Sequence, residues 1–378
     1  MQSYRIYYVW LSTILVIGIF LLLGTAVYLE PFSGDLSRLG GYPENAFGWR
    51  IPQERFSTPL YAKDGYDKYY DVVVFGDSFS FKSPGEQTDV GSYWTNYFAN
   101  RTGLSLVSFH IGKTGLEEVV GSETFLRSPP RFFIFEYVER DIVWIPQKLD
   151  AYGGYVNGCK PAPAPIMDPL VMSPLRLSPQ PFDRKEVYLQ SGDDLFGLNL
   201  TATANLLRKS IFRNILGIDN TGVINLKLTR GDLFSNNSSS EVLIYSKDTL
   251  KKNWTKKQMK EVQCSLISLQ NAIQSNGKTY FILLIVPDKL TVYDGYLKDK
   301  QYVGFGKIGQ LENLDLNMPK LRQRIKREVA AGIKDIYMPN DTHWGVNAHK
   351  MAADVIIDYL MEAGQLVLPL GENHTGVQ

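Results

Sequence analysis

The stretch Asp71–Ser80 constrains the fold more than any other part of this 378-residue chain. Four β-branched or aromatic residues there run directly into Gly-Asp-Ser. A short apolar run stopped by glycine is typical of a buried strand in a parallel sheet. Reactive groups gather beyond the carboxyl ends of such strands, so Ser78 is expected at that edge. Its hydroxyl suits a nucleophile and its N–H an oxyanion donor, although Asp77 or Ser78 could instead simply cap a helix.

A second polar turn, near the C-terminus, offers the base that a serine nucleophile needs. Ile333–Pro339 predicts a strand, and a polar turn follows it. Serine is a weak nucleophile until a base takes its proton, and a third group must orient that base. Of the four histidines, only His343 directly follows a predicted strand with a carboxylate, Asp341, two residues before it. We therefore predict Ser78, His343 and Asp341 as a catalytic triad; a surface or capping histidine is the alternative.

Gly-Asp-Ser-Phe-Ser early in the chain and Asp-Thr-His-Trp late in it resemble the SGNH (GDSL-like) hydrolase superfamily. The second motif, together with Pro287–Tyr293, resembles the SGNH-like domains of the alginate O-acetyltransferase group (AlgJ/AlgX type). Members of that group are periplasmic or membrane-tethered and acetylate exopolysaccharides. The resemblance runs from about Asp71 to about Leu360, with a large unmatched middle. The serine element comes first here, as in ordinary SGNH enzymes, whereas in the alginate proteins the Asp-x-His element comes first.

The resemblance implies an oxyanion hole beside Ser78. In SGNH proteins a glycine after the second strand points its N–H at the oxyanion. Gly112 is preferred over Gly115 because it is closer to the strand end, and an ordinary glycine turn is the alternative. Typical members also place an asparagine after the third strand, where this chain has Glu139 and Arg140. Arg140 is therefore expected either to stabilise the oxyanion or to form a structural ion pair with Glu139.

Four further side chains are expected to contact substrate. Asp77 and Trp344 are the sequence neighbours of the predicted nucleophile and base. Lys289 and Tyr293 follow the strand predicted at Tyr280–Val286, so they would lie over the carboxyl edge of the sheet. For Lys289 a structural role is an equally good alternative.

Composition excludes several classes of protein. A hydrophobic content of 44% is that of a globular chain, and 40 Lys and Arg against 39 Asp and Glu give no electrostatic case for a nucleic-acid partner. No Cys/His spacing predicts zinc, and neither a metal nor a tightly bound cofactor is implied. Cys159 and Cys264 could form one disulfide in an oxidising compartment.

The N-terminal run Ile6–Leu29 is almost entirely apolar and uncharged, and it is long enough to cross a bilayer as a helix. Aromatic residues flank it at both ends, as an aromatic belt would. Arg5 and the amino terminus are the only positive charges before it, which favours a cytoplasmic N-terminus. We predict a single-pass protein of the inner membrane with its domain on the periplasmic side. A signal peptide cleaved near Ala26 is the alternative.

These patterns predict a three-layer α/β/α SGNH-like domain with a parallel sheet, behind one N-terminal transmembrane helix. The expected strands are Val72–Phe75, Leu104–Phe109, Arg131–Val138, Tyr280–Val286 and Ile333–Pro339. The expected organisation is an anchor at 1–30, a juxtamembrane linker at 31–68 and a catalytic domain at 69–378. An irregular insertion at about 142–250 is expected to cover or flank the cleft.

The predicted function is acyl transfer through an acyl-enzyme, with O-acetylation of a cell-surface or exported polysaccharide as its outcome. The expected partners are the polysaccharide acceptor and an acyl donor, which the resemblance implies is supplied through a membrane-bound O-acyltransferase. An SGNH esterase or polysaccharide deacetylase, in which water accepts the acyl group, is the first alternative. An inactive polysaccharide-binding component of a secretion complex is the second, because the asparagine donor is missing.

Overall fold

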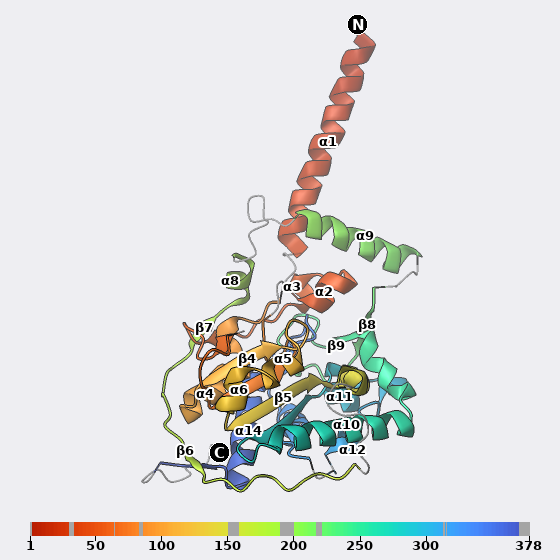
Figure 1. Cartoon of the computed structure of the whole chain (residues 1–378). Coiled ribbons are helices and arrows are strands. Elements are labelled where there is room, and N and C mark those ends of the chain that lie inside the picture. The colour runs from red at the N-terminus through yellow and green to blue at the C-terminus, as the bar shows by residue number, and fades with distance from the viewer. Residues whose placement is uncertain are drawn as a thin grey trace.

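A five-stranded parallel sheet in the order β10-β5-β3-β4-β2 forms the centre of the computed structural model (Figure 1). The structure describes residues 2–29, 34–63, 65–82, 86–149, 159–189, 200–216, 221–312, 314 and 316–369. The strands of the sheet are β2 (Ala62–Lys63), β3 (Val72–Gly76), β4 (Leu106–His110), β5 (Phe132–Val138) and β10 (Tyr280–Val286). The predicted α/β fold with a parallel sheet is confirmed, and four of the predicted strands lie in that sheet.

The strand predicted at Ile333–Pro339 is wrong. This segment forms only an isolated antiparallel bridge between Tyr337 and Trp344. Asp335 has a φ of 52°, which no strand accommodates, and its carboxylate accepts a hydrogen bond from Ser235 N at 2.8 Å. The edge of the sheet beside β4 is taken instead by β2, from the segment predicted to be a linker.

Helices cover both faces of the sheet. Alternate residues of β3 and β5 enter two separate apolar clusters, with Val72 and Val74 on one face and Val73 and Phe75 on the other. The first face packs against α4 (Trp94–Thr102), α11 (Lys289–Tyr293), α13 (Leu321–Ala330) and α14 (Val346–Glu362). The second packs against α5 (Leu116–Val120), α6 (Glu123–Arg127), α7 (Ile145–Lys148), α10 (Lys256–Gln274) and α12 (Ile308–Leu311).

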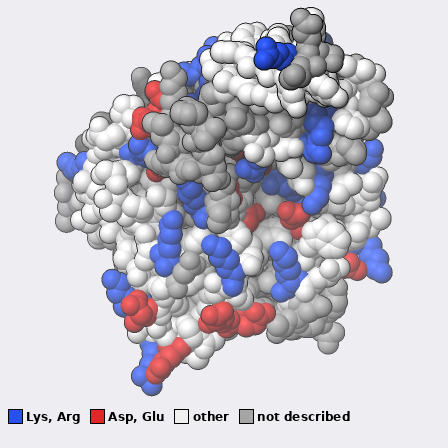
Figure 2. Space-filling model, turned by 90° about the horizontal axis from the view of Figure 1, so that it is seen from above, with Lys and Arg blue, Asp and Glu red and all other residues white. Residues whose placement is uncertain are grey.

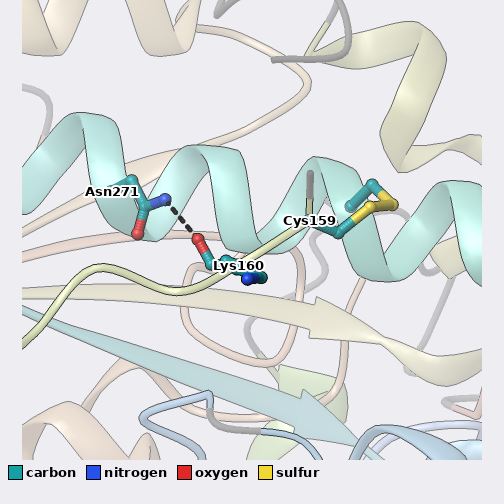
Figure 3. The surroundings of a disulfide bond; sticks show 4 residues. Cys159, Lys160 and Asn271 are labelled. Carbon is teal, nitrogen blue, oxygen red and sulfur yellow. Dashed lines mark hydrogen bonds between the residues drawn. A yellow bond between two sulfur atoms is a disulfide. The ribbon is translucent and has the colours of Figure 1, made fainter. Parts of the chain in front are cut away.

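The chain between α7 and α10 spans most of the stretch, about 142–250, where an irregular insertion was predicted. Its elements are β6 (Leu170–Val171), β7 (Gln180–Phe182), α8 (Arg184–Leu189), α9 (Leu200–Leu216) and the antiparallel pair β8 (Val223–Lys227) and β9 (Glu241–Tyr245). β6 pairs with β11 (Leu366–Val367), and β7 pairs with β1 (Gln53–Arg55). A disulfide joins Cys159 to Cys264 of α10, and Asn271 Nδ2 donates to Lys160 O at 3.0 Å (Figure 3). The disulfide that the sequence left open is therefore formed, and it ties the start of this segment to α10.

α1 (Gln2–Leu29) projects from the domain as one apolar helix (Figure 1). Tyr4–Tyr28 is long and apolar enough to cross a membrane, and its most apolar part is not buried against the domain. α1 is therefore a candidate membrane span, although a signal sequence at the N-terminus has the same length and composition. After it, α2 (Asp35–Gly40) and α3 (Glu44–Phe47) pack on the domain, where Leu36 and Phe47 share an apolar cluster with Leu243 of β9.

Candidate active site

Ser78, His343 and Asp341 lie together at the carboxyl edge of the sheet. Ser78 sits in the tight turn that follows β3, where the N–H groups of Ser80 and Phe81 donate to Asp77 O. Its Oγ is 2.8 Å from His343 Nε2, and His343 Nδ1 is 2.6 Å from Asp341 Oδ1. The serine and the carboxylate thus contact opposite nitrogens of one imidazole ring, as in a nucleophile–base–orienter triad.

The carboxylate of Asp341 receives four hydrogen bonds. Oδ1 accepts from the ring and from the backbone N–H of His343, the latter at 2.9 Å. Oδ2 accepts from Asp35 N at 3.1 Å and from Gln87 Nε2 at 2.9 Å. Burial alone would raise the pKa of Asp341, but the charge of His343 and these hydrogen bonds hold that pKa well below its usual range. The orienting group is therefore a fixed anion.

His343 is buried between three carboxylates. Burial alone would lower its pKa, but the charges of Asp341, Glu86 and Asp35 outweigh this effect and raise the pKa to about 9. Glu86 Oε1 lies 3.9 Å from Nε2, and Asp35 Oδ2 lies 3.9 Å from Nδ1. The surroundings thus favour the imidazolium that forms when the histidine takes a proton from Ser78.

The segment after α1 closes over the loop that carries Asp341. The N–H groups of Leu36 and Ser37 both donate to Asn340 O at 3.1 Å, and Thr342 N donates to Asp35 Oδ1 at 2.7 Å. A Cβ on Gly34 would lie 2.1 Å from Asn340 O, so only glycine allows this approach. Burial, reinforced by the Asp341 charge, raises the pKa of Asp35 to about 6. Asp35 was not predicted, because nothing in the sequence around it points to a contact 306 positions away.

Lys289 does not contact substrate as predicted but holds this loop from inside. Its side chain is 1% exposed, and Nζ donates to Met338 O at 2.8 Å, Pro339 O at 3.0 Å and Asp341 O at 3.0 Å. All three ammonium protons are therefore used. Burial lowers the pKa of Lys289 to about 7. The alternative structural role fits these contacts.

The other three predicted substrate contacts are also engaged within the protein. Tyr293 and Trp344 are fully buried, and the Trp344 ring lies 4.9 Å from that of Phe79. Asp77 is half-buried, with Oδ1 accepting from Phe79 N and Oδ2 from Val138 N, both at 3.0 Å. Asp77 thus shapes the turn that carries Ser78, and Tyr293 and Trp344 belong to the buried core against which the site packs. The sequence placed these residues at the correct edge but could not show what covers them.

Of the two N–H groups predicted to bind the oxyanion, one is available and the other is engaged in a hydrogen bond. Ser78 N donates to no atom in the described parts of the chain, so it is available to a substrate. Gly112 N instead donates to His110 Nδ1 at 3.0 Å, within its own turn. A substrate would have to displace this bond to use the Gly112 N–H. The choice between Gly112 and Gly115 stays a prediction.

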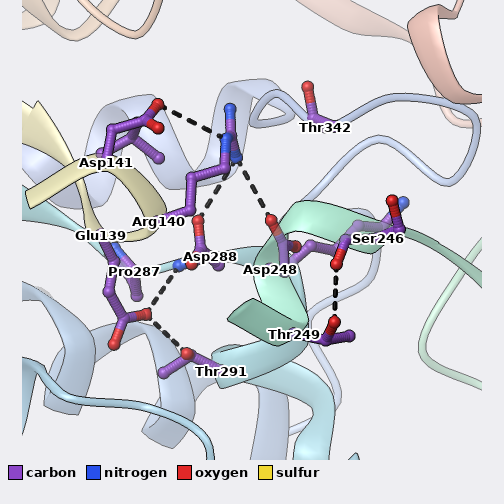
Figure 4. A network of polar contacts seen from close by, with 12 residues as sticks. Glu139, Arg140, Asp141, Ser246, Asp248, Thr249, Pro287, Asp288, Thr291 and Thr342 are labelled. Atoms are coloured by element: carbon purple, nitrogen blue, oxygen red, sulfur yellow. Dashed lines mark hydrogen bonds and ion pairs between the residues drawn. The ribbon is translucent and has the colours of Figure 1, made fainter. Parts of the chain in front are cut away.

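Arg140 and Glu139 belong to a buried network of charges (Figure 4). Arg140 Nη1 lies 3.3 Å from Asp288 Oδ1 and 3.6 Å from Asp248 Oδ1. Glu139 pairs not with Arg140 but with Lys251, at 3.0 Å, and Lys251 also pairs with Asp288. The network joins the ends of β5 and β10 to the turn after β9, next to the Asp77 turn. An oxyanion role for Arg140 stays a prediction, and these contacts are structural.

Asp35, Asp341 and His343 could together offer three ligand atoms to a metal ion, since those atoms lie within 4.8 Å of one another. The same atoms are already engaged with one another and with Thr342 through hydrogen bonds. His343 Nδ1 faces Asp341 and Nε2 faces Ser78, so no ring nitrogen is left for a metal. The donor set fits a triad better than a metal centre.

A family model matches part of the chain. Residues 243–375 match the family model of the SGNH hydrolase-like domain of acetyltransferase AlgX. Searches of curated proteins and of solved structures found no match. The matched segment covers β10, Asp341, His343 and α14 but not Ser78, which the fold brings to the histidine. The predicted resemblance is confirmed: this part of the chain is similar to the SGNH hydrolase-like domain of acetyltransferase AlgX, within an SGNH-like α/β fold.

Proposed function

We propose that this protein is an O-acyltransferase that acetylates a cell-surface or exported polysaccharide. The hydrogen-bonded arrangement of Ser78, His343 and Asp341 carries the proposal, because it suits the formation of an acyl-enzyme. The similarity to an acetyltransferase domain favours an acetyl group as the cargo. It does not identify the polymer.

The proposed reaction has two steps. Ser78 Oγ attacks the carbonyl carbon of the acyl donor and passes its proton to His343 Nε2, while Asp341 holds the ring through Nδ1. The tetrahedral intermediate collapses, the bond to the leaving group breaks, and the proton on Nε2 goes to that group. A sugar hydroxyl then loses its proton to Nε2 and attacks the Ser78 ester. The polysaccharide ester leaves, and the proton returns to Oγ.

The oxyanion of both intermediates is proposed to bind the free N–H of Ser78. The N–H of Gly112, once substrate has displaced its bond to His110, and the guanidinium of Arg140 are further candidates. Each oxyanion donor is typically worth about 10²–10³-fold in rate, so a single variant can be measured.

We place the domain on the periplasmic side of the inner membrane, behind α1 as a single-pass anchor. The apolar length of α1 and the disulfide between Cys159 and Cys264 support this, since disulfides persist in oxidising compartments. The acyl donor is proposed to come from a membrane-bound O-acyltransferase. An anchored protein should stay in the membrane fraction after high-salt and alkaline washes, whereas a soluble mature form starting near Val27 would indicate a cleaved signal peptide.

The decisive test follows the fate of the acyl group on wild-type protein. The full chain is loaded with a model acetyl ester, and the Ser78 acetyl-enzyme is followed by mass spectrometry with and without excess short glycan. Transfer predicts acetylated glycan as the acetyl-enzyme decays, and slow loss to water without glycan. Ser78→Ala should form no acetyl-enzyme, while Ser57→Ala, an exposed serine, should behave as wild type.

The same test separates the alternatives. Rapid release of free acetate whether or not glycan is present would identify an esterase with the same triad. Failure of the wild type to form any acetyl-enzyme would leave the inactive polysaccharide-binding protein as the better interpretation.

A further inference from the structure

Helix α9 occupies an unusual place in the molecule. It runs across the C-terminal end of α1, on the side of the domain from which α1 projects (Figure 1). It contacts both α1 and α2. In sequence it lies far from both, within the insertion. Its position is therefore set by contacts with the N-terminal segment rather than by the sheet.

One face of α9 is fastened to the C-terminal end of α2. Lys209 Nζ donates to Arg38 O at 2.8 Å and to Leu39 O at 2.9 Å. Arg213 Nη1 donates to Gly40 O at 2.6 Å, and its guanidinium stacks 4.0 Å from the Tyr42 ring centroid. These two cations, one turn apart, satisfy carbonyls that the end of α2 leaves without helical partners. This face of α9 is thus turned toward the domain.

The opposite face of α9 is apolar and exposed. Ile211, Phe212 and Ile215 are 49%, 45% and 74% exposed. At 3.6 residues per turn Ile211 and Ile215 point away from Lys209 and Arg213, hence away from α2, and Phe212 lies at the side of the helix between Ile215 and Lys209. Arg208, also exposed, is on the same side. Three large exposed apolar side chains on one helix mark a surface that is expected to bind another molecule or a membrane, because single exposed apolar residues are common but a row of them is not.

We propose that α9 lies in the interface of the bilayer crossed by α1, with Ile211, Phe212 and Ile215 among the lipid acyl chains. The inference rests on the membrane location given to α1 under the proposed function. α9 lies where α1 would leave the bilayer, and it crosses the direction of α1 instead of continuing it (Figure 1). An amphipathic helix with basic residues on its polar side suits that position, and Arg208 can extend from its stem to the lipid phosphates.

The charge on this side of the molecule is compatible with a lipid surface. Figure 2 looks onto the face from which α1 projects and shows Lys and Arg side chains spread over it among Asp and Glu side chains. Anionic headgroups attract such cations. The contact of α9 with the candidate membrane span α1 makes a phospholipid surface the proposed occupant, and a second protein is an outcome of the test below.

The consequence for the proposed reaction is a fixed height of the active site above the membrane. α9 holds the C-terminal end of α2, and Asp35 at the other end of α2 donates its N–H to Asp341. Leu29 and Gly34 are five residues apart, so their Cα atoms are at most about 19 Å from each other. Two membrane contacts, α1 and α9, would therefore hold the triad near the surface from which an acyl donor is delivered.

The test places a fluorophore on the proposed lipid face. The two native cysteines form a disulfide, so a single new cysteine, Ile211→Cys, can be labelled selectively with an NBD dye. The full chain is reconstituted in vesicles of phosphatidylethanolamine and phosphatidylglycerol. Ile166→Cys is the matched control, because Ile166 is fully exposed in the 160–169 segment at the end of the domain opposite α1 (Figure 1).

The expected result is blue-shifted emission at position 211, quenched by nitroxide lipids and protected from iodide. Position 166 should emit as in water and respond only to iodide. Water-like emission at 211 would overturn the proposal. So would protection from iodide without quenching by nitroxide lipid, since a protein would then cover the face. Ile215→Cys repeats the measurement, in case the label at 211 disturbs α9.

Two controls keep this test separate from the proposed function. A sulfonyl fluoride must modify Ser78 of the labelled protein at the wild-type rate, which verifies that the triad is intact. If the reconstituted chain is released by alkaline washing, α1 is not an anchor and the inference about α9 fails with it. If the chain stays in the vesicles and forms the acetyl-enzyme but position 211 faces water, only the inference about α9 fails.

Discussion

Replacing Asp341 by asparagine should alter both the rate and the pH dependence of Ser78 chemistry. The carboxylate accepts two hydrogen bonds on each oxygen, so an amide in its place must turn its NH₂ toward donors on one side. If the NH₂ faces His343 Nδ1, the ring proton moves to Nε2, and the ring can no longer take the serine proton. In a serine protease triad this wrong tautomer lowers kcat by about 10⁴-fold.

The pKa of His343 sets the magnitude at each pH. Its rise from 6.5 to about 9 corresponds to about 3 kcal/mol in favour of the imidazolium. The base must be neutral, so the wild-type rate should increase with pH up to about 9, and at pH 7 only about 1% of the rings are neutral. Without the Asp341 charge the pKa of His343 falls toward 6.5, so the limb of the pH–rate profile on which the rate rises moves to lower pH. At pH 10 the Asp341→Asn variant should therefore react about 10³–10⁴-fold more slowly than the wild type. At pH 7 this difference in rate should be smaller, by up to about 100-fold.

Inactivation by a sulfonyl fluoride measures the reactivity of Ser78 at each pH without knowledge of the natural substrate. The second-order rate constant is followed from pH 6 to pH 10 for the wild type, for Asp341→Asn, and for Asp67→Asn, an exposed carboxylate that should change nothing. An Asp341→Asn rate within about threefold of wild type, with an unmoved limb, would refute the assignment of Asp341 as the orienting group.

Three other changes test the surroundings of the site. Lys289→Met removes a donor from three buried carbonyls, of which Met338 O keeps the N–H of Asp341, so inactivation of Ser78 should slow at every pH and unfolding should need about 1–3 kcal/mol less. Equal behaviour of this variant and the exposed Lys298→Met would contradict that reasoning. Glu86→Gln removes a charge 3.9 Å from Nε2, so the limb on which the rate rises with pH should move to lower pH while the plateau stays, and an unmoved limb in the pH profile counts against this reasoning. Cys159→Ser with Cys264→Ser opens a link across 105 positions and should cost about 2–5 kcal/mol in thermal unfolding; the wild type in reductant should match it.

The sequence predicted the parts of the fold that depend on short-range pattern. β3, β4, β5 and β10 are short apolar runs that end in glycine or polar residues, and each is a strand. The segment 333–338 also has apolar residues, at Ile333, Ile336, Tyr337 and Met338, but a positive φ at Asp335 turns it away from the sheet. Burial makes both kinds of segment apolar, so composition alone cannot distinguish a buried strand from a buried irregular turn.

The residues of the candidate site also fall into those that local sequence signals predicted and those that they missed. Ser78, Asp341 and His343 were predicted because strand ends and the Asp-x-His spacing are local signals. Asp35 and Glu86 were missed, because their contacts with the triad join distant positions. Lys289 was predicted at the right edge of the sheet but in the wrong environment, since the loop before Asp341 covers it.

The juxtamembrane segment also changes where the functional unit begins. A boundary at residue 69, as the sequence suggested, would remove β2 from the edge of the sheet and the Asp35 N–H from Asp341 Oδ2. It would also remove the two N–H groups, from Leu36 and Ser37, that hold Asn340 O. Since each lost bond lies on the loop that orients His343, the segment after α1 is part of the active site and not a tether. The smallest chain that retains the triad geometry therefore begins before Gly34.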